Sequence, residues 1–280
     1  MNDDRPPTRP NTPAALIGDL GDVWASLEAL LSSLDEDAFA APTACPGWSV
    51  SDVVAHITGT ELMMAGEAAP AVEVPDLAHL RNDIGRANEA WIIERRSWNP
   101  AQVVDEFRSV VARRASELAE LTQDDIDAAS WTPAGHATLG RFLQIRVFDT
   151  WIHELDIRDA VGEAGHESGP AVRRTLAEIG NGLGFVVGKK AAAPDGSWVR
   201  IELPGPEGVA YNVVVDGRAS VVDAAPPGEP TVSLTASSTD FVRCIGGRID
   251  SVRYLEDGRI TLRGDEELGE RVVAELAYTI

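Results

Sequence analysis

The first half of the chain places its apolar residues with the period of an α-helix. Over residues 12–34, leucines and valines recur at three- and four-residue spacing, which marks one buried helix face. Thr12 is placed to cap this helix, and Pro13 suits its first position, where no backbone N–H is needed. The same period predicts further helices over 49–65, 76–98, 100–121 and 138–162, with connections short enough for an antiparallel bundle.

After Gly165 the pattern changes from a helical period to a period of two. Asp216-Gly217, between two alternating segments, is a strong signal for a β-hairpin turn. We predict an α+β fold in two domains, a helical bundle over 1–165 and a smaller α+β domain with an antiparallel sheet over 166–280. In this second domain, strands are expected at 198–203, 211–215, 218–222, 231–235 and 259–262, and helices at 168–188, 238–245 and 265–278.

Composition narrows the class of protein. The chain has 280 residues, and its 24 basic and 45 acidic residues give a net charge of −21, which argues against nucleic-acid binding and against an anionic membrane surface. No apolar run is long enough to cross a bilayer, and the polar, proline-rich first residues lack the apolar core of a signal peptide. We therefore expect a cytoplasmic protein, a monomer or homodimer, that acts on a small molecule without nucleic-acid or membrane partners.

Three residues on two of the predicted helices suggest a metal site. Asp149 and His153 lie four positions apart in the helix over 138–162, so their side chains share one face. Apolar residues flank Asp149, and an unpaired carboxylate among them is costly. His56, in the helix over 49–65, also has apolar neighbours. Three ligands with an open position are the pattern of a catalytic metal.

The spacing alone leaves a second interpretation open. Acidic residues and histidines four apart are common on solvated helix faces, and His56 is also compatible with a hydrogen-bonded core histidine. The remaining histidines are expected at the surface, His79 on a helix face and His136 and His166 in loops.

The segment PTACPGWSVSDVVAHITGTEL resembles the hallmark of the mycothiol-dependent maleylpyruvate isomerase family, within the DinB-like superfamily. In that family a Cys-Pro-Gly-Trp turn precedes a helix with a metal-binding histidine, which matches His56. A later helix carries an acidic residue and a histidine four apart, which match Asp149 and His153. The C-terminal half resembles the sterol-carrier-like α+β domain of the family. The resemblance thus implies a DinB-like four-helix-type bundle followed by that smaller domain.

The resemblance also implies the cofactors. His56, Asp149 and His153 are expected to hold a divalent metal, and mycothiol is the expected thiol cosubstrate. Two imidazoles and a carboxylate suit Zn²⁺ first, and also Ni²⁺ or Fe²⁺. The characterised isomerase has glutamate at the position of Asp149, whose side chain is one methylene shorter. This departure leaves the reaction type open.

Four other residues have two interpretations each. Arg248, in CIGGRID, matches a family arginine thought to reach the active site, which implies a catalytic fork for a substrate carboxylate; the alternative is a solvated loop arginine. Cys45 is either a nucleophile or a structural residue. Trp48 either lines the site or forms a hydrophobic staple. Asp156 either orients an imidazole or makes an ordinary ion pair.

We therefore expect a metal- and mycothiol-dependent enzyme in which a metal-activated thiolate attacks a small electrophile, as an S-transferase or an isomerase. A hydroxide on the same metal would give hydrolysis instead. The alternative is a non-catalytic metal- or ligand-binding protein, or a regulatory protein, with the same fold.

Overall fold

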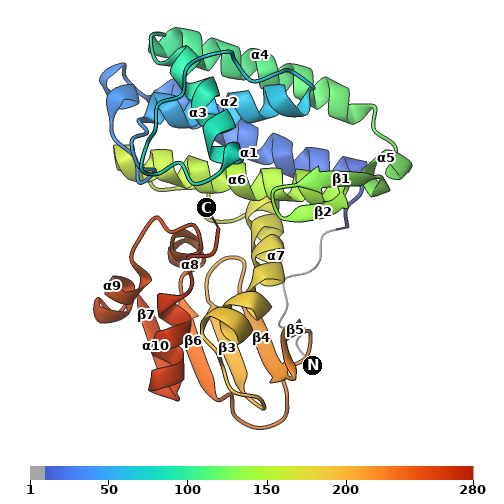
Figure 1. The fold of residues 1–280 in the computed structure, drawn as a ribbon, viewed down its shortest axis with the longest axis vertical. Coiled ribbons are helices and arrows are strands. Elements are labelled where there is room, and N and C mark those ends of the chain that lie inside the picture. The colour runs from blue at the N-terminus through green and yellow to red at the C-terminus, as the bar shows by residue number, and fades with distance from the viewer. Residues whose placement is uncertain (1–9, 280) are drawn as a thin grey trace. The chain divides into compact units, whose positions relative to one another are not determined.

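The computed structural model describes residues 10–279, which divide into two compact units, 11–165 and 166–279, with Pro10 grouped with the second (Figure 1). The first unit is helical. Its long helices are α1 (Pro13–Ser33), α2 (Val50–Met64), α3 (Asp83–Arg95), α4 (Pro100–Ala119) and α6 (Leu139–Val161). Shorter elements are the 3₁₀ helix η1 (Asp37–Ala40), α5 (Gln123–Asp127) and the hairpin strands β1 (Ala129–Thr132) and β2 (Gly135–Thr138).

Local sequence signals set the ends of these helices. The side chain of Thr12 accepts a hydrogen bond from the N–H of Ala15 at the start of α1. Thr138 caps α6 in the same way, and α6 ends at Gly162, whose φ of 73° suits glycine. A capping box of Ser49 and Asp52 opens α2. The predicted helices α1, α2, α4 and α6 are confirmed.

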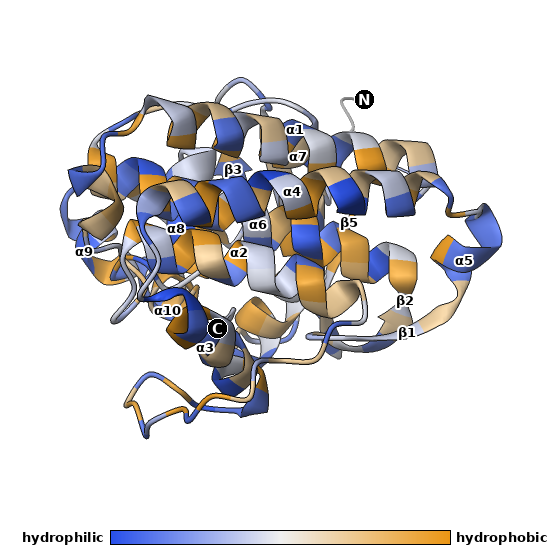
Figure 2. Ribbon diagram, turned by 90° about the horizontal axis from the view of Figure 1, so that it is seen from above, coloured by the Kyte–Doolittle hydropathy of each residue, from blue (hydrophilic) through white to orange (hydrophobic). Residues whose placement is uncertain are grey.

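Packing in the first unit brings α2 and α6 together. Helix α2 contacts α3, α4 and α6, and α1 contacts α4 and α6. Apolar and polar residues alternate around α4 (Figure 2), and most of its buried side chains are apolar. At Gly59 a Cβ atom would lie 2.4 Å from Cγ of Trp91, so this glycine allows α2 and α3 to approach closely. The helices that carry the candidate ligands are therefore fixed by a close-packed core.

Two sequence predictions for this unit are wrong in detail. The helix predicted over 76–98 begins only at Asp83, because the side chain of Asn82 accepts the N–H of Gly85 and caps it there. The segment predicted as a loop before α6 contains the β1–β2 hairpin, which turns at Gly135 with a φ of 99°. None of the described helices has the length and apolarity needed to cross a membrane.

The second unit is an α+β domain. Its helices are α7 (Pro170–Phe185), the π-helical segment η2 (Val186–Lys190), α8 (Ser238–Ile245), α9 (Ser251–Glu256) and α10 (Glu266–Ala274). Its strands are β3 (Trp198–Leu203), β4 (Val209–Asp216), β5 (Arg218–Val222), β6 (Val232–Ala236) and β7 (Ile260–Gly264). They form one sheet in the order β5-β4-β3-β6-β7. The predicted α+β fold class is confirmed, although helix α9 was not predicted and α10 ends earlier than expected.

The sheet is mixed, which corrects the prediction of an antiparallel sheet. The predicted hairpin is present, since β4 pairs with β5 around Gly217, whose φ is 64°. However, the chain after β5 crosses over, and β6 pairs with β3 in parallel, from Val199↔Val232 to Glu202↔Thr235. Alternation along a strand gives its faces but not its neighbours, so the sequence pattern did not reveal this pairing.

Candidate metal centre

The turn before α2 and the cap of α2 together set the position of His56. The N–H of Trp48 donates to the carbonyl of Cys45 at 3.0 Å, and Gly47 within this turn has a φ of 79°. Proline followed by glycine at the centre of a turn is typical of type II turns. The capping box then starts α2, so that His56 lies in the second turn of the helix and is only 4% exposed.

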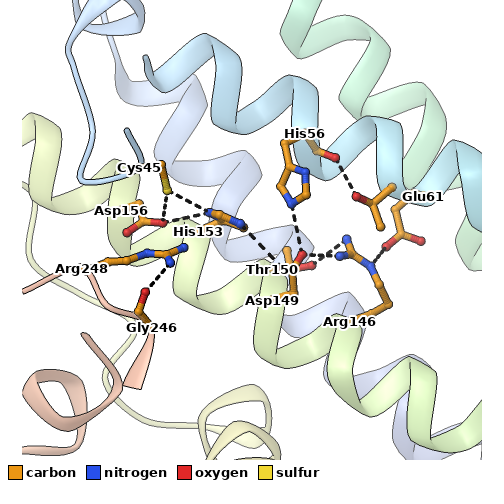
Figure 3. Close-up of polar contacts among 11 residues, drawn as sticks. Cys45, His56, Glu61, Arg146, Asp149, Thr150, His153, Asp156, Gly246 and Arg248 are labelled. Carbon is orange, nitrogen blue, oxygen red and sulfur yellow. Dashed lines mark hydrogen bonds and ion pairs between the residues drawn. The ribbon is translucent and has the colours of Figure 1, made fainter. Parts of the chain in front are cut away.

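His56, Asp149 and His153 converge (Figure 3). Nε2 of His56 lies 3.4 Å from Oδ2 of Asp149, and Nε2 of His153 lies 3.8 Å from Oδ1 of the same carboxylate. The two imidazole rings have centroids 4.7 Å apart. One nitrogen or oxygen from each residue lies within 4.8 Å of the others. This spacing suits three ligands around one ion.

The burial and the protonation state of His56 suit a metal ligand. Neither ring nitrogen of this buried imidazole has a hydrogen-bond partner among the described residues. Burial lowers the pKa of His56 to about 4, against the opposing effect of Asp149, so the ring is neutral at pH 7. A neutral imidazole has one nitrogen with a lone pair, which is costly to bury without a partner, and a divalent cation would supply that partner.

His153 is held in place by contacts to Nδ1, the ring nitrogen that does not face Asp149. Its Nδ1 lies 2.9 Å from Oδ2 of Asp156, and the thiol of Cys45 donates to the same oxygen at 3.1 Å. Burial disfavours the imidazolium, but the hydrogen bonds to Asp156 and Cys45 outweigh it and raise the pKa of His153 to about 10. With Nδ1–H donated to Asp156, Nε2 is the nitrogen that faces Asp149 and His56. Asp156 thus does what a carboxylate behind a metal-binding histidine does elsewhere, fixing its tautomer and orientation.

Cys45 lies close to this pair. Its Sγ is 3.8 Å from Nδ1 of His153, so Cys45, His153 and Asp156 also meet the spacing of a ligand group. All three are buried, and their hydrogen bonds satisfy one another. We interpret this group as support for His153, in keeping with the structural interpretation of Cys45.

Arg146 was not foreseen from the sequence. It is 2% exposed and forms an ion pair with Asp149, while its Nε donates to Glu61 at 3.0 Å. Arg114 approaches the other oxygen of Glu61 at 3.3 Å. Burial alone would raise the pKa of Asp149, but Arg146 and the two histidines hold it well below its usual range. The candidate carboxylate ligand is therefore ionised and fixed in place.

Comparisons with known proteins show what each part of this chain is similar to. Residues 20–158 match the family model described as the mycothiol maleylpyruvate isomerase N-terminal domain. Residues 187–276 match the SCP-2 sterol transfer family. The chain belongs to the mycothiol maleylpyruvate isomerase family. An uncharacterized protein of Mycobacterium tuberculosis, Rv0036c, is 28% identical over 222 residues, which cover 71% of this chain and 77% of that protein.

Solved structures of the family share this fold. The crystal structure of the mycothiol-dependent maleylpyruvate isomerase matches with a TM-score of 0.56 and 19% identity, over 88% of this chain and 92% of that one. A point mutant of the same enzyme matches with a TM-score of 0.57 over the same shares. At this identity the likeness establishes the fold, and the chemistry depends on the residues described above.

Trp48, from the turn that carries the family resemblance, lies against both imidazoles. Its ring centroid is 5.1 Å from that of His56 and 6.0 Å from that of His153. Its indole Nε1 donates to the fully buried Glu89 at 3.0 Å. His79 approaches Glu89 at 3.5 Å and lies in a turn with its side chain 24% exposed, so the prediction of a solvated helix face was wrong for this residue. Trp48 therefore forms an apolar wall beside the candidate ligands.

The other predicted residues belong to other elements of the chain. His136 is exposed in β2, where its neighbours leave it solvated. Arg248 belongs to the second unit and follows α8, and its Nη1 donates to the carbonyl of Gly246 at 2.7 Å. Its role in catalysis stays a prediction.

Proposed function

We propose that this protein is a metal- and mycothiol-dependent enzyme, an isomerase or S-transferase acting on a small electrophile. The observation that carries the proposal is the convergence of His56, Asp149 and His153, in which neither ring nitrogen of the buried His56 makes a hydrogen bond to a described residue. The family membership supports the same proposal, since its members include a mycothiol-dependent isomerase.

These three side chains would hold the ion, with Zn²⁺ first and Ni²⁺ or Fe²⁺ as alternatives. When bound, a divalent ion lowers the pKa of a coordinated thiol and keeps it as the thiolate at neutral pH. The protein's own residues then have separate roles. Asp156 fixes the tautomer of His153, Arg146 keeps Asp149 ionised, and Trp48 excludes water from one side.

Two outcomes follow from attack by such a thiolate. The sulfur forms a bond to an alkene carbon, and the electron pair of the double bond moves onto the substrate's conjugated carbonyl. If rotation follows and the C–S bond breaks, the double bond reforms in the other geometry and the thiol is regenerated, which is isomerisation. If the adduct instead takes up a proton on carbon, the thioether persists, which is S-transfer. Asp149 is one methylene shorter than the glutamate of the characterised isomerase, and this difference leaves open whether isomerisation or S-transfer dominates.

The test begins with metal content. We expect the wild-type protein and a His136→Ala control, altered at an exposed strand, to retain about one zinc ion per chain after dialysis. His153→Ala should lose the ion, because two remaining ligands hold it poorly. Full metal occupancy in His153→Ala would refute the ligand assignment.

The second part of the test measures turnover. Wild-type protein is incubated with mycothiol and maleylpyruvate, and the products are followed by mass spectrometry for the isomer and for the thioether. A protein that holds the metal but gives neither product does not act on maleylpyruvate, and this outcome favours the alternative hypothesis of a non-catalytic metal-binding protein.

Arg248 is tested in the same assay. If it binds a substrate or thiol carboxylate, Arg248→Ala should lower kcat/KM by about 30-fold or more, with unchanged metal content. Arg253→Ala, at an arginine 76% exposed on α9, is the matched control. Normal turnover in Arg248→Ala would remove Arg248 from the site.

A further inference from the structure

The sheet of the second unit has two unlike faces. Val232 and Leu262 point toward α10, and Tyr211 reaches the carbonyl of Leu176 in α7, so the apolar face packs against helices. Residues at the alternate positions of β3, β6 and β7 point to the opposite face. These residues are mostly polar, and with the chain before β6 they line a groove of about 650 Å³. The groove falls within the size range of small-molecule sites.

The strand register places two arginines in one row of this face. Arg200 on β3 lies opposite Ser233 on β6, and Ser233 lies opposite Arg263 on β7. Since neighbouring strands are about 4.8 Å apart, the two arginine backbones flank the serine hydroxyl at about 10 Å from each other. A row of arginine, serine and arginine on one face supplies the kinds of donor that bind a carboxylate or a phosphate. The pair is conspicuous in a chain with a net charge of −21.

Arg200 is held in a fixed orientation. Its Nε donates to Glu202 at 2.6 Å and its Nη1 to Oδ1 of the fully buried Asn212 at 2.9 Å. The side chain of Arg263, by contrast, is exposed and makes no ion pair or hydrogen bond to the residues that the structure describes. One arginine is thus already ordered, and the second is available to close on a ligand. Glu229 also lines the groove and offers an acceptor for a ligand hydroxyl.

Two buried donors beneath the groove have no partner. The indole Nε1 of Trp198, a lining residue only 8% exposed, and Nδ2 of Asn212 make no hydrogen bond within the described part of the chain. Buried donors without acceptors are rare and costly, and they are typical of places that a water or a ligand completes. Trp198 also gives the groove an apolar wall.

We propose that this groove binds a small organic anion, with its carboxylate or phosphate over Ser233 between Arg200 and Arg263 and its carbon skeleton against Trp198. The site is independent of the metal ligands, because every residue that forms it belongs to the sheet domain. The second unit is therefore a binding module in its own right.

The experiment uses the full chain with ¹⁵N-labelled indoles. Trp198→Phe assigns the Trp198 indole resonance, which is then followed by NMR during titration with inorganic phosphate and, separately, with succinate. Sodium chloride at matched ionic strength is the reference. We expect a saturable shift with at least one anion, and the one that binds identifies the preferred group.

Variants decide whether the anion binds in the groove. Arg263→Ala should weaken the binding at least tenfold, and so should Ser233→Val, whereas Arg253→Ala on α9 should leave it unchanged. Zinc content should be the same in all of them. A shift that follows ionic strength alone, or an equal affinity in Arg263→Ala and wild type, would overturn the proposal, as would the absence of any saturable shift with both anions.

Discussion

The two units of this protein differ in how deeply their charged side chains are buried. In the helical unit, Glu61 and Arg146 are buried beside the candidate metal ligands. In the sheet domain, the corresponding ion pair of Arg200 and Glu202 lies on an open face, with 20% and 44% of the side chains exposed. In the first case, burial together with buried hydrogen bonds and charges shifts the pKa values of His56, Asp149 and His153. In the second case, water screens the charges.

This contrast is consistent with placing the proposed metal centre in the bundle. Large pKa shifts of a carboxylate and two imidazoles require the exclusion of water, as the pKa values of His56 and His153 show. The open sheet face suits reversible binding, where exposed arginines recognise an anion without reacting with it.

The largest expected effect comes from breaking the buried network. Arg146→Met removes the arginine that pairs with Asp149, while Glu61 keeps Arg114. Losing one partner of a buried pair costs about 3–5 kcal/mol of folding free energy. Urea unfolding of the metal-free protein, followed by the helical circular dichroism signal, measures it.

Two controls sharpen this test. Arg113→Met, at a guanidinium 44% exposed on α4, should cost less than about 1 kcal/mol. Saturating zinc should restore part of the loss in Arg146→Met, because the ion replaces the missing positive charge at Asp149. A loss that zinc does not reduce would argue against Asp149 as a ligand.

Much of this arrangement could be predicted from sequence, and the reason is that its signals are local. Caps such as Thr12 and Ser49, and the four-residue spacing of Asp149 and His153, depend on neighbours within one or two turns. The contacts that were missed join distant segments. Arg146 meets Glu61 across 85 positions, and Cys45 meets Asp156 across 111.

The sheet of the second unit also contains contacts that sequence patterns do not predict. The hairpin at Asp216-Gly217 follows from two adjacent residues, whereas the parallel pairing of β3 with β6 depends on a crossover. The anion groove depends on that pairing as well, because it sets Arg200 opposite Ser233. A sequence pattern predicts the face of the sheet on which a residue lies. Its neighbour on the next strand depends on the strand register.

The second prediction concerns the pH dependence of metal binding. Since the pKa of His153 is raised from 6.5 to about 10 in the metal-free protein, this residue carries a proton at pH 7 that a metal must displace. Zinc affinity should therefore rise about tenfold per pH unit between pH 7 and pH 9. Competition with a chromophoric chelator at fixed ionic strength measures this slope.

The same proton affects folding. A raised pKa means that protonated His153 stabilises the metal-free protein fully below pH 6.5, and that this stabilisation is lost as the pH rises through about 10. Asp156→Asn removes the carboxylate that holds the proton, so the pKa should fall and the zinc affinity should change less between pH 7 and pH 9. An unchanged slope in Asp156→Asn would show that another group supplies the proton.

The smallest effect is expected on the sheet face, and it tests whether the contrast between the units holds. Glu202→Gln removes the partner of Arg200, but both side chains are partly solvated and Arg200 keeps its bond to Asn212. The free energy of unfolding should change by less than about 1 kcal/mol, the usual range for exposed pairs. Anion binding should persist or strengthen, since a negative charge beside the proposed site is gone. A loss as large as that of Arg146→Met would mean that water does not screen this face, and the distinction between the two units would fail.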